Sequence, residues 1–176
     1  MNESKQIDER VPLLNAKSLT TVGVLCAAGA AFSVLGADGG GAQFGAVVVG
    51  LLAVYLLATM CMCRLRISLG QIEVGVFPFR KRLPIADVVG SSARVVDPVQ
   101  GPRLRWRKNG IGLPGMQLGW YTTSSGKRVF AATAGLRGRV LIPTRGSHDI
   151  LVSCLDPDRV VNAVKRHCRQ NDQADV

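Results

Sequence analysis

The longest uncharged run of the sequence constrains the fold most. It extends from Phe44 to Cys63 and, apart from Thr59, holds no strongly polar side chain. A helix of that length rises about 30 Å, which matches the hydrocarbon thickness of a bilayer. A buried helix of a globular domain usually keeps one polar stripe, which this run lacks. The run therefore predicts a transmembrane helix.

A second uncharged run, Leu19 to Gly36, precedes it and is richer in Ala, Gly and Thr. The glycine-rich link Ala37 to Gln43 between the runs is short enough to force an antiparallel pair. We expect a transmembrane helical hairpin over residues 19–63, with helices at 19–36 and 44–63. A cleaved signal peptide is the alternative for the first run, because small residues follow its apolar core.

Basic residues flank the hairpin, while the link carries no Lys or Arg. Lys17 lies before the first run, and Arg64 and Arg66 follow the second. The positive-inside tendency then predicts a multi-pass protein of the cell inner (cytoplasmic) membrane with both termini cytoplasmic. Residues 1–18 are polar and mixed in charge, which predicts a disordered N-terminal tail.

From Leu65 onward the apolar residues alternate with polar ones, as in β-strands. We expect about seven strands between residues 64 and 169, with Ser124 to Lys127 as a hairpin turn. Asp156 is a natural N-cap and Pro157 a natural first residue for a closing helix. Residues 170–176 are polar and are predicted to form a disordered C-terminal tail.

Two segments carry a family resemblance. One is the run from Ile72 through Phe77-Pro78 to Val88, and the other runs from Trp106 to Tyr121. With the apolar hairpin before them, they resemble the small bacterial membrane-anchored PH-like domain proteins. The resemblance implies an α+β fold, in which a strongly bent antiparallel β-sheet or barrel of about seven strands is capped by the C-terminal helix. It implies no catalytic role, although PH domains elsewhere often bind phosphoinositides.

A glycine-rich segment, Gly110 to Gly115, formally matches the dinucleotide fingerprint G-x-G-x-x-G. That fingerprint needs a helix directly after the glycines, whereas Pro114 and a strand-like segment follow here. A nucleotide-binding regulator or an enzyme that uses this loop is kept as the alternative function. The favoured interpretation is structural, a shaped loop with flanking aromatic residues: Trp106, Gly110, Gly112, Pro114, Gly115, Gly119 and Trp120.

The chain carries a net charge of +10, and the basic excess lies after Arg64. A charge of this kind suits an anionic lipid surface or an acidic partner. Two runs are candidate contacts, Arg80-Lys81-Arg82 in an expected turn and an alternating strand from Arg103, and we expect the first to contribute more. A solvated surface is the plain alternative for both. The residues concerned are Arg80, Lys81, Arg82, Arg103, Arg105, Arg107 and Lys108.

Catalytic and metal-binding signals are sparse. His148 and His167 are the only histidines, and the five cysteines show no metal-ligand spacing or disulfide framework. Nucleic acid is not expected as a partner, because aromatic residues are scarce among the basic ones. We therefore predict a non-enzymatic interaction or scaffold module without a cofactor, on the cytoplasmic face of a bacterial membrane. It would bind a protein partner or anionic lipid head groups.

Overall fold

The computed structural model describes residues 7–13, 15–35, 40–68, 70–97, 101–135 and 138–174. They form two sheets, three α-helices and two short 3-10 turns, η1 (Ile85–Asp87) and η2 (Gly90–Ser92). The helices are α1 (Ala16–Leu35), α2 (Gly40–Met62) and α3 (Pro157–Ala174). The strands are β1 (Ile7–Arg10), β2 (Arg64–Ser68), β3 (Gln71–Val76), β4 (Phe79–Pro84), β5 (Arg94–Val96), β6 (Leu104–Leu113), β7 (Met116–Thr123), β8 (Arg128–Ala134), β9 (Arg139–Ile142) and β10 (His148–Ser153).

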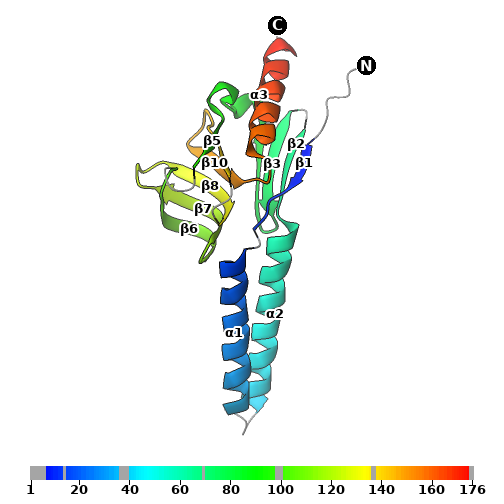
Figure 1. Cartoon of the computed structure of the whole chain (residues 1–176), viewed down its shortest axis with the longest axis vertical. Coiled ribbons are helices and arrows are strands. Elements are labelled where there is room, and N and C mark those ends of the chain that lie inside the picture. Colours follow the sequence, from blue (N-terminus) through cyan, green and yellow to red (C-terminus); the bar gives the residue numbers. More distant parts are fainter. Residues whose placement is uncertain are drawn as a thin grey trace.

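Helices α1 and α2 pack side by side and project away from the sheets (Figure 1). Gly29 lets them approach closely, because a Cβ there would lie 2.5 Å from Cγ1 of Val49. Of the expected link Ala37 to Gln43, residues 37–39 lie outside the described residues and the rest belongs to α2. Large apolar side chains are exposed along the pair, and such a surface is suited to contact with another apolar surface. They include Val24, Leu25, Phe44, Val47, Leu51, Leu52 and Val54.

The predicted membrane insertion is not upheld. Within the described ranges, none of the helices combines the length and apolar content that crossing a membrane requires. Part of each apolar run instead packs against the sheets, since Val22, Leu56 and Met60 are buried in the same apolar cluster as the strands. The transmembrane hairpin over residues 19–63, the two-span integral membrane protein and the multi-pass inner-membrane localisation with cytoplasmic termini were therefore wrong predictions.

The first sheet has four antiparallel strands in the order β1-β2-β3-β4. Its inner face carries apolar residues at every second position, such as Leu65, Ile67, Ile72 and Val74, all fully buried. Strand β1 lies in residues 1–18, which were expected to be disordered. Pairing with β2 orders this segment, and Val11 and Leu13 after it are buried in the core.

The second sheet has six strands in the order β5-β9-β10-β8-β7-β6. Neighbouring strands within this sheet pair antiparallel, except β8 and β10, which pair parallel. The Ser124 to Lys127 turn between β7 and β8 is confirmed, since Gly126 N–H donates to the Thr123 carbonyl at 3.0 Å. In the described residues β4 and β5 do not pair with each other, and η1 and η2 lie between them in the chain. The predicted sheet or barrel of about seven strands is therefore replaced by two sheets, which do not close into a barrel.

Helix α3 packs against η1, η2, β5, β9 and β2. Its start is as predicted, because Asp156 Oδ1 accepts a hydrogen bond from Arg159 N–H at 3.0 Å. The helix continues to Ala174, well past the expected end at Arg169. Its apolar stripe of Val160, Val164 and Cys168 completes the core.

Asn15 joins the helical pair to the second sheet. Its Oδ1 accepts a hydrogen bond from Ser18 N–H at 2.9 Å, which caps the N-terminus of α1. Its Nδ2 donates to the Gly115 carbonyl at 2.8 Å, in the turn between β6 and β7. One side chain therefore both begins the helix and holds the tip of a hairpin a hundred residues away in the sequence.

Replacing Asn15 by Ala should lower the free energy of unfolding by about 1–2 kcal/mol, because a helix cap and a long-range hydrogen bond are both lost. Chemical denaturation of the full chain measures this. Asn162→Ala, at an exposed position of α3, is the matched control and should not destabilise the protein. Equal effects of the two substitutions would contradict the assigned role.

His167 of α3 is buried, and neither ring nitrogen has a hydrogen-bond partner among the described residues. Burial, aided by the positive charge of Arg166, lowers the pKa of His167 below 6.5. Below about pH 6.5, His167 of the unfolded chain binds a proton more readily than His167 of the folded chain does. The free energy of unfolding is therefore highest above about pH 6.5 and falls as the pH drops below that value.

We expect the free energy of unfolding of His167→Leu to fall less than that of the parent chain between pH 7.5 and pH 5, as measured by urea titration at each pH. Asn162→Ala, at an exposed position of the same helix, is the control and should leave the pH profile of the parent chain unchanged. Parallel pH profiles for His167→Leu and the parent chain would show that His167 is not responsible.

Candidate functional site

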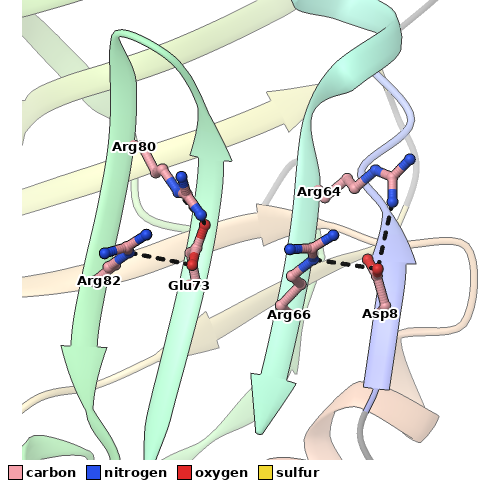
Figure 2. Close-up of polar contacts among 6 residues, drawn as sticks. All are labelled: Asp8, Arg64, Arg66, Glu73, Arg80 and Arg82. Atoms are coloured by element: carbon pink, nitrogen blue, oxygen red, sulfur yellow. Dashed lines mark hydrogen bonds and ion pairs between the residues drawn. The ribbon is translucent and has the colours of Figure 1, made fainter.

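The outer face of the four-stranded sheet carries a ladder of four arginines and two carboxylates (Figure 2). Arg66 and Arg64 of β2 approach Oδ2 of Asp8 in β1 at 3.2 and 3.4 Å. Arg82 of β4 lies 3.2 Å from Glu73 of β3, and Arg80 of β4 pairs with the same carboxylate. Glu73 thus lies on a strand between the arginines of β2 and those of β4.

This ladder changes the interpretation of the Arg80-Lys81-Arg82 run. The run lies within β4, not in a turn. Arg80 and Arg82 point to the outer face and share Glu73, so much of their charge is neutralised. Lys81 points to the opposite face, where its Nζ lies 5.6 Å from the centre of the Trp120 ring. The three residues therefore do not form one basic contact surface.

The second basic run forms an exposed edge. We call Arg103, which directly precedes β6, together with Arg105, Arg107 and Lys108 the β6 basic strand, and all four are exposed. Among the described strands, β6 lies at the end of its sheet and pairs only with β7. Among the described residues, none of these four side chains forms an ion pair. The strongest unneutralised positive charge of the predicted candidates is therefore on β6.

The register of β6 departs from simple alternation. It shifts between Leu104 and Trp106 and again between Arg107 and Asn109, so Arg105 and Lys108 are extra residues opposite β7. A one-residue shift moves the following side chains to the other face. Leu104 accordingly packs in a small cluster with Val129 and Leu151, while Trp106 is 65% exposed with the Arg105 guanidinium 5.8 Å from its ring.

The glycine segment is a β-hairpin. Gly110 and Gly112 lie in β6, Pro114 and Gly115 form its two-residue turn, and Gly119 lies opposite Gly110 in β7. Gly110 and Gly119 both have positive φ, and a Cβ on either would collide with the backbone of the other strand. Strand β7 follows the turn where a phosphate-binding loop would require a helix. These glycines shape a twisted hairpin.

The three buried cysteines and His148 have shifted pKa values. Burial raises the pKa of Cys63 to about 12 and also raises the pKa of Cys154 and Cys168, so these cysteines stay as thiols. Burial and the charge of Lys81 lower the pKa of His148, with Asp149 and Asp87 acting in the opposite direction. In the described part of the chain, no three His, Cys, Asp or Glu residues gather as metal ligands.

Comparison with known proteins yields no relative. No protein-family model, curated protein or solved structure matches the chain.

The basic residues of β6 are recognisable in the sequence, whereas the two carboxylates that pair with the arginines of β2 and β4 are not among the predicted site residues. Asp8 lies in residues 1–18, which the sequence predicts to be disordered, and Glu73 lies in the alternating segment that it predicts to form strands. A signal for Glu73 exists in the sequence, because it alternates with Ile72 and Val74 as Arg80 and Arg82 alternate around Lys81. A turn between two such strands places those polar residues on one face.

Removing the carboxylate charge of Glu73 should release the arginines of β4. We expect Glu73→Gln to increase the affinity of the full chain for a fluorescent polyglutamate peptide, because Arg80 and Arg82 become free to bind it. Fluorescence anisotropy at low salt measures the change. Asp158→Asn removes one exposed charge from α3 and should have the smaller effect; equal gains would indicate that only net charge matters.

Proposed function

We propose that this chain is a non-enzymatic interaction module, and that the β6 basic strand binds an acidic, extended segment of a protein partner. The observation that carries the proposal is an exposed edge strand whose four basic side chains form no ion pair with any described residue, together with a tryptophan that is 65% exposed.

The edge position supports an extended binding partner. In the part of the chain that the structure describes, β6 has a neighbouring strand on one side only, so its other side offers backbone N–H and C=O groups to an incoming strand. The bulges at Arg105 and Lys108 interrupt this edge, and side-chain contacts therefore have to supply much of the affinity.

Trp106 and its arginines supply such contacts. Tryptophan and arginine are the residue types that most often dominate the energy of protein interfaces. Arg105 already lies over the Trp106 ring, which holds both side chains near a bound conformation. Carboxylates of the partner would bind the guanidinium groups as charge-assisted hydrogen bonds.

The resemblance to PH-like proteins stays a prediction and agrees with a binding role without catalysis. The high thiol pKa values and the strand after the glycine turn favour binding over the alternative of a nucleotide-dependent regulator or enzyme. Anionic lipid head groups, the other partner predicted from the sequence, offer charge but no extended backbone for the edge of β6.

Two triple substitutions in the full chain test the proposal, since each removes three positive charges. R103Q/R105Q/R107Q should weaken binding of a fluorescent polyglutamate peptide by about tenfold or more. R80Q/K81Q/R82Q should weaken it less, because Glu73 already neutralises two of those residues. Trp106→Ala should further weaken binding of the peptide, although it leaves the net charge unchanged.

The affinity should also fall with added salt, since these groups are exposed and screened over about 8 Å at physiological ionic strength. Equal losses from the two triple variants would contradict the assignment to β6. Binding to anionic vesicles without binding to polyglutamate would replace the protein partner with a lipid surface.

A further inference from the structure

The second bulge of β6 opens a cavity that none of the sequence motifs predicts. Lys108 is the extra residue between the pairs Arg107–Tyr121 and Asn109–Trp120. A bulge bends its strand and redirects the side chain of the extra residue. Beside it lies a cavity of about 230 Å³.

Four strands supply the walls of this cavity. Lys108 and Asn109 come from β6, Trp120 from β7, Arg128 from β8 and His148 from β10. Arg128 lies directly opposite His148 in the parallel pair β8–β10, so both side chains lie at the same end of the sheet. The cavity is therefore built on strands, which hold its side chains more firmly than loops would.

The charge of the cavity is positive. Lys108 and Arg128 form no ion pair among the described residues, and no carboxylate lines the walls. Lys81 of β4 is near the cavity but does not line it, with its Nζ 5.6 Å from the centre of the Trp120 ring. The neighbouring carboxylate of Asp149 is occupied elsewhere, by Lys127 Nζ at 2.9 Å and Thr144 N–H at 3.1 Å.

One wall is aromatic and fixed. The Trp120 ring meets Phe130 and His148 edge-on, with ring centres 5.3 and 5.1 Å apart. Phe130 is fully buried, so it anchors Trp120 to the core. The Nε2 atom of His148 is buried and has no hydrogen-bond partner among the described residues.

We propose that this cavity binds a small organic phosphate, whose phosphate contacts Arg128 and Lys108 and whose apolar part lies against Trp120. A phosphate monoester carries a charge of about −1.5 to −2 and suits the two cations of the walls better than a single carboxylate does. The planar fork of Arg128 can bind two phosphate oxygens at once. The cavity is smaller than the usual pocket for drug-sized ligands, about 300–1,000 Å³, which limits the organic part to about one ring.

Phenyl phosphate is a suitable probe, and the chain reports on its binding by itself. Trp106 and Trp120 are the only two tryptophans, so a Trp106→Phe chain leaves Trp120 as the single fluorescent reporter. Titration of this full-length chain with phenyl phosphate should change the Trp120 emission in a saturable way. Inorganic phosphate should bind more weakly, and phenol should give no saturable change.

Arg128→Gln in the same background should weaken phenyl phosphate binding by about tenfold or more, the effect of losing a charge-assisted hydrogen-bond pair. Arg94→Gln, an exposed arginine on β5, is the matched control and should leave the affinity unchanged. Arg128 is also outside the β6 basic strand, so this result is independent of polyglutamate binding. Circular dichroism of both variants checks that the fold is retained.

Absence of a saturable change, or equal affinity in Arg128→Gln and its control, would overturn the proposal. Vesicles with and without phosphatidic acid identify the source of the phosphate. Binding that requires phosphatidic acid and is displaced by phenyl phosphate assigns the site to a lipid head group. Phenyl phosphate binding that phosphatidic acid vesicles do not compete with assigns it to a free phosphate ester.

Discussion

A single apolar cluster connects the helical pair, the two sheets and α3. Met60 and Val22 from the sheet-facing ends of the helices, Leu65 and Ile72 from the first sheet and Phe130 from the second all belong to it. Burial of a large apolar side chain contributes about 1.5–3 kcal/mol, so this shared core holds the elements together far more strongly than any single polar contact. The surfaces and the cavity described above all depend on the placement that this core imposes.

That placement decides which positive charges are available to a partner. The core fixes the faces of β3 and β4, and Glu73 therefore lies between Arg80 and Arg82 on the outer side. Exposed ion pairs contribute only about 0–1 kcal/mol to stability, but they compete directly with a ligand for the same guanidinium groups. Two arginines that share a carboxylate are thus weaker anion sites than the unpaired residues of β6.

The two bulges of β6 give this edge strand two different uses. The first, at Arg105, turns Trp106 away from the position that alternation from Leu104 would give it. The second, at Lys108, opens the cavity beside Trp120. An uninterrupted strand would have placed Trp106 and Lys108 by alternation alone, and it would also have offered a flatter edge for unwanted strand pairing.

Local patterns in the sequence were sufficient for the features that depend on neighbouring residues. The cap at Asp156, the start of α3, the Ser124 to Lys127 turn and the basic character of β6 follow from local hydrogen bonding and alternation. Three features required the tertiary structure, because each depends on a strand that another segment supplies. They are the formation of a strand at residues 7–10, the arrangement in two sheets and the pairing of Glu73 with β4. The apolar runs were misinterpreted for the same reason: hydropathy measures how apolar a segment is, but only packing shows that Val22 and Met60 are buried against the sheets. The cavity at Lys108 left no signal at all, since a bulge is defined by the register of two strands and not by the residues of one.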